Sequence, residues 1–292
     1  MDRAVRPSRP PGGQGLRLRL PGGHGPGARA RDPLSDLPVN RFKRALGEGP
    51  RQIGLWTALG TGTVAEILAA AGFDWLLIDT EHAPNELTMV LDQLRAMEGG
   101  TATPVVRPAW NDAVIFKRLL DIGAQSFLVP YVQTAEEARR AVAATRYPPL
   151  GNRGVAVTHR ANRYGAVAGY HARAHQEICV LVQIETRRAL ADLEAIAAVE
   201  GVDGLFIGPS DLAADLGHLG ENRHPQAIAA FEDACARARR AGKPIGILAP
   251  VEEDARRYLE MGFSYVAVGS DVSLLRLAAE HLRARFAAAP RG

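Results

Sequence analysis

The chain contains little cysteine and lysine and no long apolar run. Its two cysteines, Cys179 and Cys235, form no CxxC pair or disulfide framework, which predicts a reducing, cytoplasmic compartment. No apolar run approaches the ~20 residues needed to span a membrane. The three lysines, Lys43, Lys117 and Lys243, all lie outside the expected strands, and this disfavours imine chemistry on a strand lysine.

Residues 1–34 differ in composition from the rest of the chain. They contain seven Gly, six Pro and seven Arg and carry a net charge of +5, whereas residues 35–292 carry −2. The segment lacks hydrophobic periodicity, which is typical of disorder, and it has no aromatic side chains to stack on bases. We therefore interpret residues 1–38 as a solvated tail and residues 39–292 as one folded domain, with neither a nucleic-acid nor a membrane partner.

From Val39 onward, short apolar segments alternate with amphipathic ones. The expected strands are Gln52–Trp56, Trp75–Ile78, Pro104–Arg107, Ser126–Val129, Cys179–Ile184, Gly204–Ile207, Ile245–Leu248 and Tyr265–Val268. Helical periodicity covers Thr63–Ala71, Leu87–Met97, Ala113–Asp121, Ala135–Ala144, Arg187–Val199, Pro225–Ala241 and Val251–Met261. Eight strands that alternate with helices predict a closed (β/α)8 TIM barrel. A doubly wound sheet is disfavoured, because Gly60-Thr61-Gly62 is not followed by the rest of a GxGxxG turn.

Ionisable residues follow several expected strands at their C-terminal ends, where barrel enzymes place their chemistry. These residues are Asp79, Glu81 and His82 after the second strand, Arg107 at the end of the third, Glu185 after the fifth and Asp211 after the sixth. Glu185 and Asp211 offer two hard oxygen ligands, which suit Mg²⁺ or Mn²⁺. Asp211 could instead cap the next helix; together with Glu185, we favour the metal site.

His82 is the candidate general base, because an imidazole near pKa ~6.5 transfers protons near neutral pH. Asp79 could orient it, or could cap the loop. Arg107 could stabilise an anionic or enolate oxygen, or could form a salt bridge to Asp79 or Glu81. Trp56 could line an organic substrate or belong to the core.

The turn Gly208-Pro209-Ser210-Asp211 presents backbone N–H groups near a helix start. Such groups can bind a substrate carboxylate.

Together these residues resemble the HpcH/HpaI aldolase family, the class II pyruvate aldolases. The resemblance extends from about Arg41 to Phe286. It is carried by Gly54-Leu55-Trp56, Ala71–Asp79, Glu81-His82-Ala83-Pro84-Asn85, Val105-Val106-Arg107-Pro108, Trp110-Asn111-Asp112, Arg146-Tyr147-Pro148-Pro149, Val182-Gln183-Ile184-Glu185-Thr186 and Gly201–Leu212. One departure is Thr80, where relatives often have Gly, and the tail before Pro38 has no counterpart.

The resemblance implies a role for each site residue. Glu185 and Asp211 would bind a divalent metal (Mg, Mn or Co) that pyruvate chelates, and Gln183 would support the metal waters. Arg107 would stabilise the enolate, and the turn from Gly208 to Asp211, through Pro209 and Ser210, would hold the carboxylate. His82 would transfer a proton at the 4-hydroxyl, paired with Asp121 as a dyad and with Asp79 nearby. Trp56 and Leu248 would line the aldehyde end.

The resemblance further implies a homohexamer built as a dimer of trimers, with sites near subunit interfaces and a swapped C-terminal helix. The expected activity is reversible cleavage of 4-hydroxy-2-oxo acids to pyruvate and an aldehyde through a metal-bound enolate. An example is 4-hydroxy-2-oxoheptanedioate, from aromatic compound catabolism. Two alternatives stay open: a CoA-thioester C–C lyase of the citrate lyase type, and a non-catalytic oligomeric barrel that binds a keto acid. The sequence names neither the aldehyde nor the metal.

Overall fold

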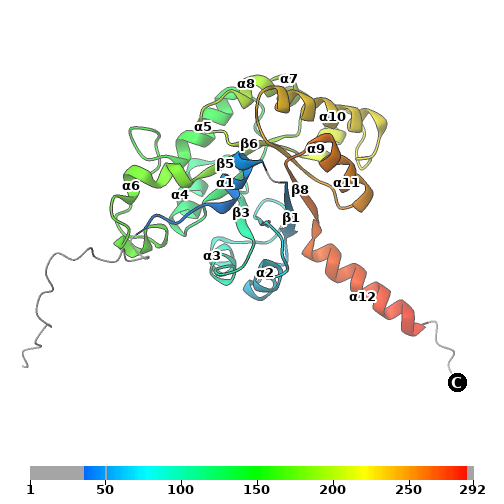
Figure 1. Cartoon of the computed structure of the whole chain (residues 1–292), viewed down its shortest axis with the longest axis horizontal. Helices are drawn as coiled ribbons and strands as arrows, with labels where there is room; N and C mark the ends of the chain where they lie inside the picture. The colour runs from blue at the N-terminus through cyan, green and yellow to red at the C-terminus, as the bar shows by residue number, and fades with distance from the viewer. Residues whose placement is uncertain (1–35, 50, 288–292) are drawn as a thin grey trace, which may run out of the picture.

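Eight parallel strands pair in chain order and close into a barrel, with β1 paired to β8. The computed structural model describes residues 36–49 and 51–287. The strands are β1 Gln52–Thr57, β2 Trp75–Asp79, β3 Thr103–Arg107, β4 Ser126–Val129, β5 Cys179–Ile184, β6 Gly204–Ile207, β7 Ile245–Leu248 and β8 Tyr265–Ser270. The predicted TIM barrel is therefore confirmed (Figure 1). Most of the predicted tail, residues 1–35, lies outside the described residues.

Helices between the strands cover the outside of the barrel, whereas α1 precedes β1 and α12 projects away after β8 (Figure 1). They are α1 Arg41–Glu48, α2 Gly62–Ala69, α3 Leu87–Ala96, α4 Ala113–Asp121, α5 Ala135–Thr145, α6 Tyr170–Arg173, α7 Arg187–Ala191, α8 Leu193–Ala197, α9 Pro209–Asp215, α10 Pro225–Arg240, α11 Glu252–Met261 and α12 Asp271–Ala287. None of the helices in the described part of the chain is both long and apolar enough to cross a membrane.

The single helix expected over Arg187–Val199 is instead divided at Asp192 into α7 and α8. The Asp192 carboxylate accepts the Ala135 backbone N–H at 2.9 Å, at the start of α5. A short polar side chain that hydrogen-bonds to backbone groups competes with helix continuation. This tertiary contact accounts for the break, which helical periodicity alone did not predict.

Strand alternation determines which side chains enter the barrel. One buried cluster fills the interior and a second lies between the strands and the helices. The interior cluster contains Trp56, Trp75, Leu77, Val105, Leu128, Cys179, Leu181, Phe206, Tyr265 and Ala267. Because inward positions recur every second residue, Asp79 and Arg107 continue the inward rows of β2 and β3. Gln183 and Glu185 continue that of β5.

Helix α1 closes the N-terminal end of the barrel. Phe42 and Leu46 join the interior cluster, and Phe42 packs on the rings of Trp75 and Tyr265, each with a centroid distance of 5.7 Å. The Asn40 side chain caps α1 and also donates to the Ser126 hydroxyl at 2.8 Å, at the start of β4. With this end filled, the opposite, C-terminal end is the mouth available for a site.

A long insertion connects α5 to β5. It forms a small core of its own that contains Tyr147 and Tyr170. Arg153 is buried there, with its guanidinium carbon 4.3 Å from the centre of the Tyr147 ring. Leu37, inside the predicted tail, packs against this core, so the packed structure begins before Val39.

We predict that the interior of the barrel does not tolerate a methyl group at Gly54. An alanine Cβ there would lie 2.1 Å from the Trp75 ring, whereas one at Gly47, in α1, would meet nothing within 4 Å. Gly54→Ala should lower the free energy of unfolding by about 1–3 kcal/mol through overpacking. Gly47→Ala should raise it by about 0.5–1 kcal/mol through helix propensity. Urea unfolding of both variants measures this, and equal effects would contradict the packing described here.

Candidate active site

A buried ion pair joins the ends of β2 and β3 at the barrel mouth. Arg107 donates from Nε to Oδ1 of Asp79 at 2.9 Å and from Nη2 to Oδ2 at 2.6 Å. Burial alone would raise the pKa of Asp79, but the hydrogen bonds and charge of Arg107 bring it below its ordinary value. Burial alone would lower the pKa of Arg107. The hydrogen bond and charge of Asp79 more than offset this effect, so the pKa of Arg107 is raised. The guanidinium is therefore charged and fixed in position.

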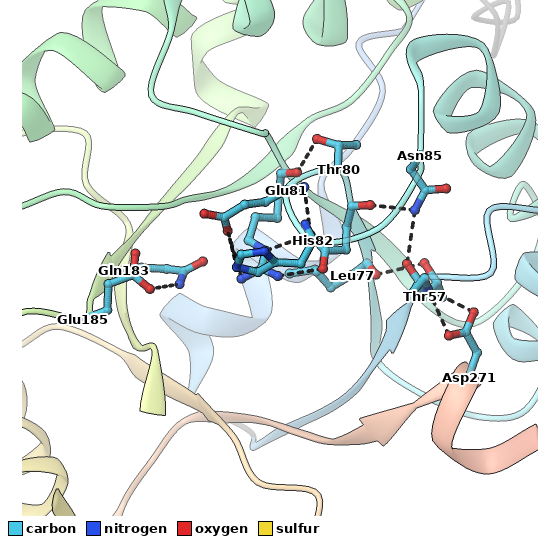
Figure 2. Close-up of polar contacts among 12 residues, drawn as sticks. Thr57, Leu77, Thr80, Glu81, His82, Asn85, Gln183, Glu185 and Asp271 are labelled. Atoms are coloured by element: carbon cyan, nitrogen blue, oxygen red, sulfur yellow. Dashed lines mark hydrogen bonds and ion pairs between the residues drawn. The ribbon is translucent and has the colours of Figure 1, made fainter. Parts of the chain in front are cut away.

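The same pair holds the loop after β2. Oδ1 of Asp79 accepts the backbone N–H groups of Glu81 and His82 at 3.0 and 3.3 Å. Thr80 donates its backbone N–H and its hydroxyl to the Arg107 carbonyl at 3.0 and 2.6 Å. The Asn85 side chain donates to the Asp79 carbonyl at 2.6 Å (Figure 2). Thr80 thus ties this loop to β3.

His82 projects from this loop with 64% of its side chain exposed. Its Nε2 atom lies 3.9 Å from Oε2 of Glu81, which also lies 3.1 Å from Nη1 of Arg107. Burial raises the pKa of Glu81, although Arg107 and His82 act to lower it. The neighbour of the imidazole is therefore Glu81, which the residue patterns left without a role. Asp79 serves Arg107 and the loop backbone instead.

Asp121 is not beside His82 within one chain. It is the last residue of α4, a helix that runs from the C-terminal end of β3 back toward the N-terminal end of β4. There its carboxylate accepts from Nη2 of the buried Arg153 at 2.8 Å. The structure thus places the two members of the expected dyad at opposite ends of the barrel.

Glu185 is a buried carboxylate, 2% exposed, with both oxygens held. Oε1 accepts the Tyr131 backbone N–H at 2.6 Å. Oε2 accepts from Nε2 of Gln183 at 2.5 Å (Figure 2). Burial raises the pKa of Glu185 to about 7; the Tyr131 hydrogen bond opposes this shift, and the charge of Asp211 adds to it. The buried Oε1 of Gln183 has no hydrogen-bond partner. A cation would relieve the cost of ionising Glu185 at this position.

Asp211 lies in the first turn of α9, close enough for its charge to raise the pKa values of Glu185 and Glu81. Gly208 is the N-cap of α9 and no side chain caps the helix, so the capping alternative for Asp211 is not what the structure forms. A Cβ on Gly208 would lie 2.3 Å from Oε2 of Glu185, which leaves room only for glycine. Two carboxylates, one of them buried, fit a divalent cation.

Trp56 and Leu248 line the floor of the mouth. Trp56 is 6% exposed and packs on Phe206 with a centroid distance of 5.7 Å, so it belongs to the core. Its ring also lies beneath Arg107, with the guanidinium carbon 5.5 Å from the ring centroid. Leu248, at the end of β7, is partly buried against the same cluster. The core alternative for Trp56 is therefore confirmed, and its contact with an organic substrate stays a prediction.

Lysines lie elsewhere, which agrees with the argument against imine chemistry. Lys43 donates to the Ile178 carbonyl before β5, and Lys243 donates to the Val202 carbonyl before β6, both at the closed end. Lys117 lies on α4 beside Gly154.

A further set of potential metal ligands in the described chain is His218, Glu221 and His224, whose ligand atoms lie within 4.8 Å of one another. This set is in the loop between α9 and α10. It is therefore a second candidate place for an added metal ion.

Tyr131 was missed by the sequence analysis. It follows β4 at the mouth, its backbone N–H binds Glu185, and its φ of 51° is in the left-handed region that non-glycine residues rarely adopt. Sequence patterns carry little signal for such a residue, because its partner is far away in the chain.

Comparison with known proteins agrees with this geometry. The chain is 58% identical over 252 residues to a protein named pyruvate aldolase from Rhizobium etli, a match that covers 86% of this chain and 99% of that protein. It is 54% identical to the 5-keto-4-deoxy-D-glucarate aldolase of Citrobacter koseri, which covers 86% of this chain and 98% of that protein.

A solved structure of an HpcH/HpaI aldolase/citrate lyase family protein from Burkholderia cenocepacia superposes with a TM-score of 0.81 at 42% identity. That match covers 84% of this chain and 98% of the solved chain. The family model for HpcH/HpaI aldolase/citrate lyase matches residues 52–278. The chain therefore belongs to the HpcH/HpaI aldolase/citrate lyase family.

Proposed function

We propose that this protein is a divalent-metal-dependent carbon-carbon lyase that cleaves a 4-hydroxy-2-oxo acid to pyruvate and an aldehyde, reversibly. The observation that carries the proposal is the fixed, charged Arg107 at the same mouth as Glu185 and Asp211. The names of the relatives from Rhizobium etli and Citrobacter koseri support pyruvate chemistry. The name of the second relative makes 5-keto-4-deoxy-D-glucarate a substrate to test, in addition to 4-hydroxy-2-oxoheptanedioate.

Glu185 and Asp211 are the residues that would hold Mg²⁺, Mn²⁺ or Co²⁺, since all three accept oxygen ligands. The bound ion would act as a Lewis acid toward the 2-oxo group. The free Oε1 of Gln183 is available to a water molecule at the site. The Ser210 and Asp211 backbone N–H groups, in the first turn of α9, have no intrahelical partner and can donate to the substrate carboxylate.

Arg107 donates hydrogen bonds to the 2-oxo oxygen, where negative charge accumulates as the C3–C4 bond breaks. His82 accepts the 4-hydroxyl proton, and the bond electrons move onto the pyruvate fragment as its enolate. The C4 carbon leaves as the aldehyde carbonyl, and protonation at C3 gives pyruvate. A positioned base of this kind contributes about 10²–10⁴-fold to the rate. Oε2 of Glu81 lies 3.9 Å from Nε2 of His82 and can help to orient the imidazole.

We also propose that the protein works as a homo-oligomer, a hexamer by family resemblance. Helix α12 projects from the barrel (Figure 1) with large apolar side chains exposed. These are Val272, Leu274, Leu275, Leu277, Leu282 and Phe286. A second copy of the chain would cover this surface. A second copy is also what a His82–Asp121 pair would require, because one chain keeps these residues apart.

Metal dependence through Glu185 is the first test. Pyruvate release from 4-hydroxy-2-oxoheptanedioate and 5-keto-4-deoxy-D-glucarate should stop after EDTA treatment and return with Mn²⁺ or Mg²⁺. Glu185→Gln should abolish the return of pyruvate release on adding metal. His218→Ala, which alters the other candidate set of metal ligands, should retain it. Release that persists after EDTA and in Glu185→Gln would refute the proposal.

Arg107 should be needed for enolate formation as well as for cleavage. In Arg107→Ala, both pyruvate release and the exchange of pyruvate C3 protons in D2O should fall at least about 10²-fold, as for loss of an oxyanion donor. Proton NMR follows the exchange. Arg107→Lys keeps the charge but loses the two-point contact with Asp79, and should recover only part of the rate. Exchange at the native rate in Arg107→Ala would exclude the enolate role.

Metal affinity should depend on pH through Glu185. Because its pKa in the metal-free protein is about 7, metal binding must displace a proton below that pH and none above it. The Kd for Mn²⁺ should therefore rise about tenfold for each pH unit below 7 and be constant above pH 8. Calorimetric titration between pH 5.5 and 8.5 measures this. An affinity that does not vary over this range would show that Glu185 has an ordinary pKa or is not a ligand.

A further inference from the structure

Two exposed aromatic rings lie against each other at the rim of the mouth. The ring centroids of Trp110 and Tyr131 are 5.7 Å apart, with an angle of 30° between the planes. Their exposed fractions are 53% and 36%. Trp110 follows β3, the strand that ends in Arg107, and Tyr131 follows β4. Paired aromatic surface left open to water is typical of a binding surface.

Both rings are held in place by their own loops. The Tyr131 backbone N–H binds Glu185 at 2.6 Å, and the left-handed φ of 51° is a local strain of the kind found at functional sites. Beside Trp110, the Asn111 side chain donates to the Glu137 carbonyl of α5 at 3.1 Å. The Asp112 side chain caps α4 through two backbone N–H groups. The two rings therefore form a preorganised surface.

The floor of the mouth leaves little space for a large substituent. Trp56 is 6% exposed and packs against Phe206, so a bulky group on C4 must extend outward from Arg107 and Glu185 toward the rim. The Trp110 indole carries no charge, and a phenol, with an ordinary pKa of ~10, is neutral near pH 7. A substituent that reaches the rim next to Glu185 meets neutral aromatic faces.

We propose that Trp110 and Tyr131 form an aromatic platform that binds the aldehyde end of the substrate and favours aromatic or aliphatic substituents on C4. The inference rests on the proposed aldolase function and adds to it a substrate class. Neither ring touches the reacting atoms, so both are specificity-determining residues.

Two substrates that differ only at C4 test the platform. Cleavage of 4-hydroxy-2-oxo-4-phenylbutanoate gives pyruvate and benzaldehyde, and cleavage of 4-hydroxy-2-oxobutanoate gives pyruvate and formaldehyde, which is too small to reach the rim. Trp110→Ala removes one ring. Tyr131→Gly removes the other and keeps the backbone unstrained at positive φ, so the bond to Glu185 can persist. Tyr131→Phe is the matched control, because it keeps the ring.

For the phenyl substrate, each ring-removing variant should lower kcat/KM about 3- to 10-fold, the value expected for loss of one aromatic contact. In Trp110→Ala, which is remote from Glu185, cleavage of the formaldehyde-yielding substrate, pyruvate C3 proton exchange and native mass should not change. Tyr131→Phe should match the wild type on both substrates.

Equal losses on both substrates, or a changed native mass, would overturn the platform and assign the rings to general positioning or to subunit contact. The platform would also be overturned if the ring-removing variants cleaved the phenyl substrate at the wild-type rate. Proton exchange and cleavage of the small substrate by the same protein would then leave the aldolase function intact. Absence of exchange and of cleavage in the metal-loaded wild type would refute the aldolase function and the platform together.

Discussion

The ion pair between Asp79 and Arg107 is the interaction on which the rest of the site depends. It joins the ends of two neighbouring strands with two hydrogen bonds and keeps a guanidinium charged where only 8% of the residue is exposed. The same carboxylate fixes the loop that carries Glu81 and His82. Removing one partner of such a buried pair leaves an uncompensated charge, at a cost of about 3–5 kcal/mol. Asp79 thus acts through Arg107 and the loop, and its position determines where the imidazole can lie.

Across the mouth, the surroundings of Glu185 destabilise its ionised form. Its carboxylate is buried, lies near Asp211 and Glu81, and has a pKa of about 7, so near neutral pH the metal-free protein carries it partly protonated. The divalent cation that we propose here would compensate all of these charges together, and Gly208 leaves the space in which Oε2 of Glu185 lies. The guanidinium of Arg107, a fixed positive group beside this site, can stabilise charge that develops on a substrate oxygen.

Local patterns predicted much of this arrangement. The barrel followed from eight apolar segments that alternate with helices, and the positions of Asp79, Arg107 and Glu185 followed from the rule that barrel chemistry lies at the C-terminal ends of strands. Contacts between distant segments were less predictable. Asp192 breaks a helix because its carboxylate binds the start of α5. Tyr131 reaches Glu185 through a backbone conformation that no periodicity encodes. The pairing of Asp121 came from the family resemblance, and a single chain places it with Arg153 instead.

We propose that one divalent cation lies between Glu185 and Asp211 and faces Arg107. Anomalous diffraction from crystals of the full chain soaked with Mn²⁺ and pyruvate tests this most directly. We expect a Mn²⁺ peak bound by both carboxylates, with the 2-oxo oxygen of pyruvate directed toward the Arg107 guanidinium. A peak found only at His218, Glu221 and His224, or pyruvate bound away from Arg107, would contradict it.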